Sequence, residues 1–100
     1  MFEILHYVDT SGTDHFQAWL NALTDRQAKL AVIRRIARLQ IGLFGDRKSV
    51  RGGIQELRID ISGGYRVYFA VVGRAVILLT CGGNKQSQER YIRTAIDFAA

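Results

Sequence analysis

The sequence predicts an α+β domain with the element order β-α-α-β-β-β-α and a mostly antiparallel sheet, in which two helices form a hairpin. A short β-prone stretch at the N-terminus precedes two stretches of helical periodicity, which together cover residues 16–43. Three strand-like runs between residues 54 and 81 precede a last helical stretch. Helices gathered on one side of an antiparallel sheet are typical of this fold class. The hundred residues fit one domain over 1–100 with a single core.

The first strand is predicted over residues 2–8, which are apolar and rich in β-forming residues. Hydroxyl side chains at residues 10–13 then break the strand and offer caps for a helix. Apolar side chains follow at i, i+3, i+4 and i+7, namely Phe16, Trp19, Leu20 and Leu23. This spacing predicts an amphipathic first helix.

The second helix is predicted to start at residues 24–27, which have the Ser/Thr-x-x-Glu/Gln form of a capping box. Its core face is formed by Val32, Ile36, Leu39 and Leu43. Gly42 and Gly45 bracket its end. Because the connection to the first helix is short, we expect the two helices to pack as an antiparallel hairpin.

Residues 46–53 are predicted to form a polar, basic loop, followed by a strand whose apolar side chains alternate with Glu56, Arg58 and Asp60. Residues 62–64 (Ser-Gly-Gly) supply hairpin turn chemistry before a return strand over 65–72. The run over 75–81 is almost entirely apolar, which predicts a strand in the middle of the sheet or one covered on both sides. Residues 86–99 are predicted to form the last helix.

The composition narrows the function classes. No apolar run approaches the roughly 20 residues that span a bilayer, and residues 1–4 do not have the basic start and apolar stretch expected of a secretory signal. The single cysteine, Cys81, is expected to be a buried, inert thiol in a cytoplasmic protein. The net charge is +5, and none of the fourteen Lys and Arg residues lies before Arg26. This regional bias favours a basic face for nucleic acid or an acidic protein partner, the alternative being solubility alone.

Polar side chains on one face of the predicted sheet form the candidate site. If the helices cover the other face, Glu56, Arg58, Arg66 and Tyr68 share one concave, basic surface. A charged group inside a strand is costly unless it pairs or meets a ligand. The sequence has no His/Cys cluster with metal-ligand spacing, so we predict neither a metal nor a cofactor.

Three short motifs in this region resemble a known family. They are Gly-Ile-Gln-Glu-Leu-Arg at 53–58, Gly-Tyr-Arg-Val-Tyr-Phe at 64–69, and Gly-Gly-Asn-Lys at 82–85 followed by Gln88 and Ile92. Together they resemble the RelE/ParE superfamily of bacterial type II toxins, in particular the HigB-like addiction-module killer proteins of phage-related origin.

The resemblance implies a toxin that pairs with a small antitoxin, often a helix-turn-helix protein, and that reaches operator DNA only through the antitoxin complex. Many members cleave mRNA in the ribosomal A site without a metal. Two alternatives stay open: a ParE-like inhibitor of DNA gyrase, and a non-toxic remnant that acts only in an antitoxin complex.

The resemblance also implies catalytic roles. Arg66 occupies the position of the phosphate-stabilising arginine, although it could instead pair with Glu56 or Asp60. Lys85 matches a second cation. Tyr91 could stack on a base, help proton transfer, or simply pack on the sheet. The general base stays open between Lys85 and Glu56.

Four further residues complete the predicted site as contacts to RNA phosphates. Lys48 and Arg51 belong to the basic loop. Arg58 either binds phosphate or holds Glu56, and Gln88 either contacts RNA or caps the last helix.

Overall fold

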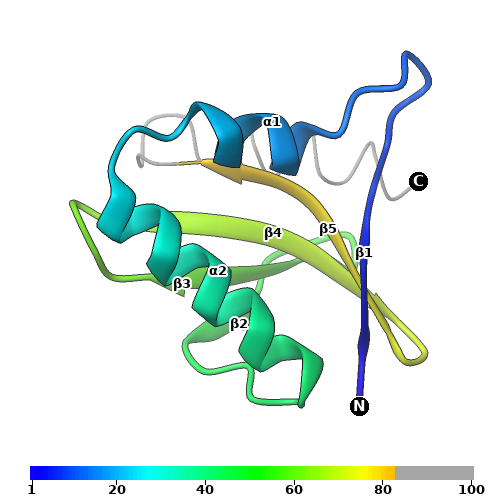
Figure 1. The fold of residues 1–100 in the computed structure, drawn as a ribbon. Coiled ribbons are helices and arrows are strands. Elements are labelled where there is room, and N and C mark those ends of the chain that lie inside the picture. Colours follow the sequence, from blue (N-terminus) through cyan, green and yellow to red (C-terminus); the bar gives the residue numbers. More distant parts are fainter. Residues whose placement is uncertain (83–100) are drawn as a thin grey trace.

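A five-stranded sheet with two helices on one face makes up the described part of the protein (Figure 1). The computed structural model describes residues 1–82, so the predicted helix over 86–99 lies outside the described residues. The elements are β1 (Glu3–His6), α1 (His15–Ala22), α2 (Arg26–Gln40), β2 (Arg47–Ser49), β3 (Gln55–Ile59), β4 (Tyr65–Val72) and β5 (Ala75–Gly82). The α+β class and the mostly antiparallel sheet are confirmed. In residues 1–82, neither helix has the length and apolar character needed to cross a bilayer.

The strands are ordered β1-β5-β4-β3-β2. β1 runs parallel to β5, and the other neighbours are antiparallel. The apolar run of β5 therefore lies between β1 and β4, inside the sheet as predicted. The turn over residues 62–64 is also confirmed, and all three of its residues have positive φ, including +50° at Ser62.

The predicted loop over residues 46–53 contains a short strand that the sequence did not indicate. β2 pairs antiparallel with β3, with Lys48 opposite Glu56, and its three residues are exposed. Lys and Ser have little intrinsic strand preference, and no apolar alternation marks this segment. Its pairing depends on the open edge that β3 presents, which is a tertiary feature.

Both helices begin at an aspartate rather than at the predicted hydroxyl caps. The Asp14 carboxylate accepts a hydrogen bond from the Gln17 backbone N–H at 2.9 Å, and Asp25 accepts one from Ala28 at 3.1 Å. Aspartate caps a helix as well as serine and better than threonine, so each start moves to the carboxylate that reaches the third N–H of the helix. The capping box predicted at residues 24–27 is therefore wrong by one residue.

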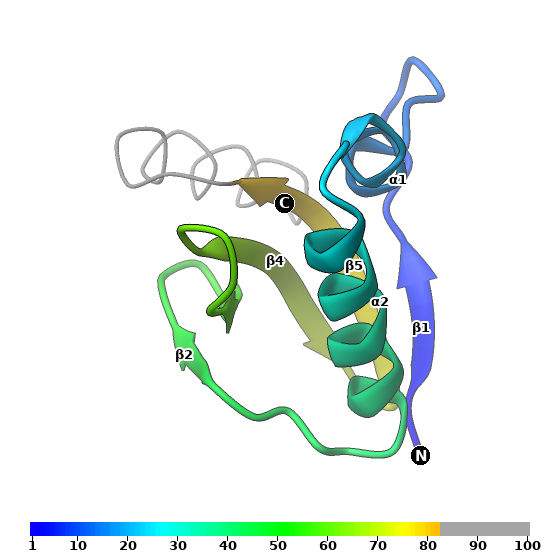
Figure 2. The same cartoon turned by 60° about the vertical axis from the view of Figure 1, so that its left-hand side comes forward.

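The helices lie on one face of the sheet and diverge from each other. α1 runs along β5, whereas α2 crosses over β1 and β3, so the two form a V rather than a closely packed pair (Figures 1 and 2). The connection explains this geometry, because Leu23 and Asp25 both have extended backbone conformations. The helices are consecutive as predicted, but their shared packing partner is the sheet.

The main core fills the space between the helices and the sheet. Its buried side chains are Phe16, Leu20, Val32, Leu39, Leu57, Ile59, Val67, Phe69, Val76, Leu78 and Cys81. The buried thiol of Cys81 is as predicted. Leu43 was expected on this face but is 58% exposed. α2 ends at Gln40, and Gly42, with φ of +82°, turns the chain before Leu43 can continue the helical stripe.

A bulge between β4 and β5 shifts the alternation of side chains. Tyr68 lies opposite Thr80 while Phe69 lies opposite Leu78, so Leu79 is an extra residue in β5. Leu79 packs with Ile54 and Tyr68 in a second buried cluster on the other side of the sheet. A bulge of this kind changes which face the side chains beyond it point to.

Candidate functional site

The candidate site lies on the far face, by which we mean the face of the sheet opposite α1 and α2. The register pairs Arg58 of β3 with Arg66 of β4, and it pairs Glu56 with Tyr68 one step further along the same strands. Strand alternation puts these four side chains on one face, as predicted. The expectation that all four form an open surface is wrong, because Glu56 and Tyr68 are completely buried.

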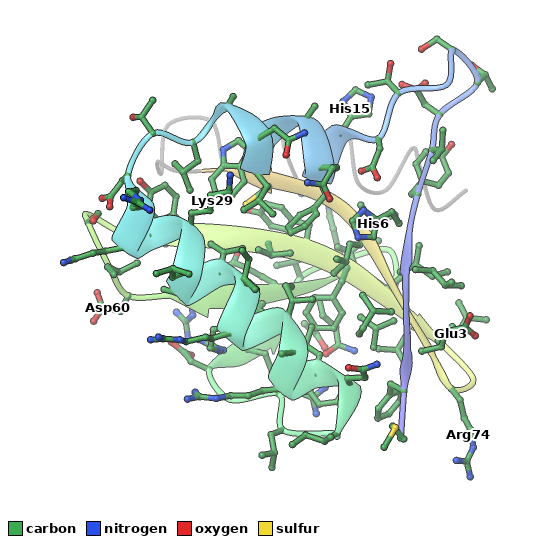
Figure 3. All side chains as sticks on the ribbon, viewed as in Figure 1. Glu3, His6, His15, Lys29, Asp60 and Arg74 are labelled. Atoms are coloured by element: carbon green, nitrogen blue, oxygen red, sulfur yellow. The ribbon has the colours of Figure 1, made fainter. Side chains whose placement is uncertain are left out.

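Arg66 is held by a buried carboxylate. Its Nε lies 3.2 Å from Oε1 of Glu56, and the side chains of the two residues are 17% and 0% exposed, respectively. Glu56 is thus the ion-pair partner, whereas Asp60, the other predicted partner, is exposed beyond the end of β3 (Figure 3). Within residues 1–82 this is the side-chain hydrogen bond that Arg66 makes, and it uses Nε.

Arg58 pairs with a carboxylate from the loop before β2. Its Nη2 lies 3.0 Å from Oδ1 of Asp46, and the two side chains are 42% and 58% exposed. Glu56, the predicted alternative partner, is bound by Arg66 instead. In the described part of the chain, Nε of Arg58 is buried and has no hydrogen-bond partner. An unsatisfied buried donor is unfavourable until an acceptor reaches it.

The two arginines form a cross-strand pair of like charges. Like charges directly opposite each other destabilise an antiparallel sheet, and an anion placed between them removes this repulsion. Each guanidinium offers five N–H donors and uses one of them on a carboxylate. The arrangement is suited to an anion with several oxygens, such as a phosphodiester.

A third arginine positions this site from the helix layer. Arg35 of α2 donates hydrogen bonds to the backbone oxygens of Arg58, Phe44 and Asp46, at 2.6, 3.1 and 3.3 Å. Burial lowers the pKa of its guanidinium from the usual value. A Cβ at Gly45, where φ is +66°, would approach Nη2 of Arg35 to 3.0 Å, so glycine makes room for this contact.

The positioning roles of Arg35 and Asp46 could not be deduced from the sequence. Arg35 lies in a run of basic residues that is typical of a solvated helix face. Gly45, ten residues later, is the one local signal of a close approach.

The remaining predicted residues divide into two groups. Lys48 lies opposite Glu56 on the exposed strand β2, and Arg51 is exposed in the loop that follows. Lys85, Gln88 and Tyr91 lie outside the described residues. Gly82, the last described residue, is the register partner of Arg66, and Lys85 follows it by three residues in the sequence.

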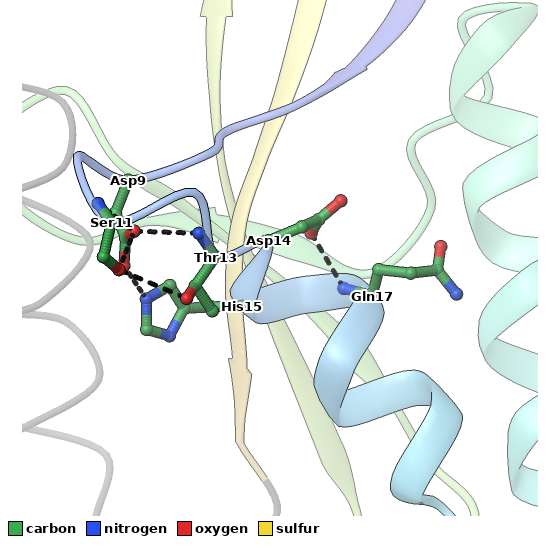
Figure 4. A network of polar contacts seen from close by, with 6 residues as sticks. All are labelled: Asp9, Ser11, Thr13, Asp14, His15 and Gln17. Carbon is green, nitrogen blue, oxygen red and sulfur yellow. Dashed lines mark hydrogen bonds and ion pairs between the residues drawn. The ribbon is translucent and has the colours of Figure 1, made fainter.

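Both histidines belong to a separate polar network around the connection from β1 to α1. Asp9 accepts hydrogen bonds from Ser11 and Thr13 and contacts Nε2 of His15 at 2.6 Å (Figure 4). The hydrogen bonds from Ser11, Thr13 and His15 lower the pKa of Asp9. The ring of His6 contacts Asp14 at 2.7 Å and packs edge-on against Phe16, a core residue on the helix side. His6 is therefore not on the far face with the arginines.

The far face can bind and stabilise negative charge. Within residues 1–82, no group of three or more His, Cys, Asp or Glu side chains could hold a metal ion. The described residues supply fixed cations and a buried carboxylate that orients one of them.

Comparison with known proteins places the chain in a family. Residues 18–100 match the family profile described as phage derived protein Gp49-like. The chain is also 48% identical, over 80 residues, to an uncharacterized protein of Haemophilus influenzae, and the match covers 80% of this chain and 81% of that protein. The chain therefore belongs to the Gp49-like family of phage-derived proteins, a family associated with type II toxin–antitoxin systems and related to RelE-like toxins.

Proposed function

We propose that this protein is the HigB-like toxin of a type II toxin–antitoxin module and that it cleaves mRNA on the ribosome. The observation that carries the proposal is the cross-strand pair of Arg58 and Arg66, in which Arg66 is oriented by a buried carboxylate. Membership of a toxin-associated family supports the toxin role. The arginine pair supports a phosphodiester as the ligand.

The proposed reaction is attack of the RNA 2′-oxygen on the adjacent phosphorus. The 2′-hydroxyl loses its proton, the new P–O2′ bond forms, and the P–O5′ bond breaks as the leaving oxygen gains a proton. Negative charge grows on the non-bridging oxygens in the transition state. Arg66 stabilises that charge through its guanidinium, and Arg58 binds the same phosphate in the ground state and in the transition state.

Glu56 acts in this proposal as a positioning residue rather than as the base. Its side chain is fully buried behind the ion pair with Arg66, so it holds the guanidinium in place. Lys48 and Arg51 bind neighbouring phosphates. From the family resemblance, Lys85 supplies a second cation, Tyr91 stacks on a base or transfers a proton, and Gln88 contacts the RNA.

The proposed partners follow from the same role. A cognate antitoxin, of helix-turn-helix type, binds the toxin in the cytoplasm and carries it to operator DNA. The ribosome presents the mRNA.

Arg66→Lys tests the catalytic assignment. Lysine keeps a cation for Glu56 but lacks the planar fork of arginine, so we expect mRNA cleavage to fall by at least about 100-fold. Cleavage is measured by primer extension after induction in cells, together with growth. The matched control is Arg74→Lys in the β4–β5 turn, an exposed position outside the far-face site (Figure 3).

Three results would contradict the proposal. Full cleavage by Arg66→Lys would show that Arg66 does not stabilise the transition state. Loss of supercoiling and an SOS response on induction, with intact mRNA, would assign the protein to the gyrase inhibitors instead. A chain that never slows growth at comparable expression would be a non-toxic remnant.

A further inference from the structure

α2 carries an apolar stripe that faces solvent. Leu30, Ile33 and the C-cap residue Ile41 are 51%, 45% and 59% exposed, and Ala37 between them is exposed as well. Their spacing of three, four and four residues places them in one line along the helix. We call these four residues the outer stripe.

The outer stripe lies opposite the face that packs on the sheet. The buried residues of α2 are Ala28, Val32 and Leu39. At 100° per residue, the centre of the outer stripe is about 160° from the centre of the buried set. It therefore cannot be the edge of the core stripe, and on a surface helix this side is normally polar.

Cations border the outer stripe on both sides. Lys29 flanks its first half on one side, while Arg34 and Arg38 follow the other side. Arg26 lies in line with the stripe, one turn before Leu30. α2 contains no acidic residue. Near the start of the helix, an open groove of about 320 Å³ is lined by Leu23, Arg26, Lys29, Leu30 and Ile33. Figure 3 shows Lys29 at this end of α2.

The arrangement of an apolar stripe with cations beside it indicates what kind of partner binds here. An apolar centre with a charged rim is the anatomy of a protein–protein interface. RNA would use the cations but would leave the aliphatic centre without an apolar partner, because phosphates dominate its contacts. The charged side chains of α2 beside the outer stripe are all positive, so the partner must be acidic.

Charge also argues against two other candidates for covering the outer stripe, namely a second copy of the chain and residues 83–100. A second copy of α2 would bring a second set of cations to the same surface. Residues 83–100 contain three basic and two acidic side chains, namely Lys85, Arg90, Arg93, Glu89 and Asp97. Neither a second copy of the chain nor residues 83–100 would therefore neutralise the cations beside the outer stripe.

We propose that the outer stripe is the docking site for an amphipathic helix with Leu or Ile along its centre and Asp or Glu along its borders. This inference rests on the proposed function for the identity of the partner, which is the antitoxin. The contact lies on the opposite side of the sheet from Arg58 and Arg66. The docked helix therefore anchors the partner without covering the arginine pair.

The test measures binding of the protein encoded by the adjacent reading frame. Each variant is made in the Arg66→Lys background, so that the chain can be expressed alone, and affinity is measured by titration calorimetry. The double variant Leu30→Asp, Ile33→Asp should bind at least about 100-fold more weakly, since it puts two carboxylates at the centre of the interface. Reversal of the rim by Lys29→Glu, Arg34→Glu should weaken binding and remove most of its salt dependence.

The matched control is Val72→Asp at the end of β4, where Val72 is 63% exposed. It removes a similar aliphatic side chain from the surface and should leave the affinity within about threefold. Leu30, Ile33, Arg34 and Val72 are exposed, Lys29 is half-buried, and unchanged thermal unfolding relative to the Arg66→Lys parent verifies that each variant folds.

The outcomes separate the two proposals. If the Leu30→Asp, Ile33→Asp variant binds the partner as tightly as its parent does, the docking site is wrong and the toxin function stands. Failure of the parent itself to bind the adjacent protein overturns both the antitoxin pairing and this inference. Loss of RNA binding in the double variant, with partner binding retained, assigns the stripe to RNA and also overturns the inference.

Discussion

The two faces of the sheet use the same strands for different purposes. On the helix side, Leu57, Val67 and Phe69 are buried against aliphatic and aromatic side chains from α1 and α2. On the far face, the alternate positions of β3 and β4 carry Glu56, Arg58, Arg66 and Tyr68. The helix side holds the fold together through apolar burial, whereas the far face keeps charge in place through ion pairs.

The comparison shows how a small protein keeps two arginines on one face of its sheet: each one is paired with an opposite charge. Neither arginine of the far face stands alone, since each has a carboxylate partner from another strand or from the loop before β2. The deeper pair, Glu56 and Arg66, is the more rigid of the two because one partner is fully buried. The outer pair, Arg58 and Asp46, is exposed and is expected to contribute about 0–1 kcal/mol to stability.

The largest effect is expected from breaking the helix side. Phe69 is fully buried, and its ring centroid lies 6.0 Å from that of Phe44. Phe69→Ala should lower the free energy of unfolding by about 3–5 kcal/mol, because it removes apolar contacts and leaves a cavity. Urea denaturation followed by circular dichroism measures the change. A loss below about 1 kcal/mol would show that this face does not dominate stability.

An intermediate effect is expected on the far face. Arg66→Ala leaves the buried Glu56 without this cation and should cost about 2–3 kcal/mol, near the low end for buried pairs because Arg66 is partly exposed. The double variant Glu56→Gln, Arg66→Ala should recover part of that loss, since a neutral amide is less costly to bury than a carboxylate. If both variants are equally unstable in urea, the ion pair is not what Arg66 contributes to the fold.

The smallest effect concerns the contact that ties the hairpin turn to the helix layer. Oγ of Ser62 donates a hydrogen bond of 2.6 Å to Oδ2 of Asp25, the N-cap of α2. This bond, followed by the Ala28 N–H, lowers the pKa of Asp25 from 3.8. A lowered folded-state pKa stabilises the protein above the unfolded pKa, and the stabilisation disappears as the pH falls through the folded value.

Ser62→Ala should therefore lower Tm by a few degrees at neutral pH, and the difference from the parent should shrink below about pH 4. Alanine keeps the same left-handed backbone requirement as serine at this position, where φ is +50°. The substitution thus isolates the hydroxyl. Thermal melts between neutral and acidic pH give the answer, and a difference that does not vary with pH would rule out the Asp25 bond as its source.

Local patterns accounted for most of the described fold. The spacing of Phe16, Leu20, Val32 and Leu39 predicted both helices and their buried faces, and all four side chains are in the core. Strand alternation also predicted that Arg58 and Arg66 share a face. These features follow from the 3.6-residue and two-residue periods of the backbone, which a sequence records directly.

Other features depend on partners that are distant in the chain. β2 exists because β3 offers it an open edge, and Leu43 leaves the core because Gly42 turns the chain. The burial of Tyr68 depends on Ile54 and Leu79, which come from other segments and pack with it on the same side of the sheet. None of these contacts has a local signature.

The sequence by itself determined the element types of the described residues apart from β2, the buried faces of the helices and the shared face of the arginines, because each depends on periodicity within one segment. Only the tertiary structure decided which carboxylate holds each arginine. Asp46 reaches Arg58 because Arg35, from α2, holds the backbone of residues 44–46 against β3. Such a contact joins three separate segments, and its geometry is defined only once the helix has packed on the sheet.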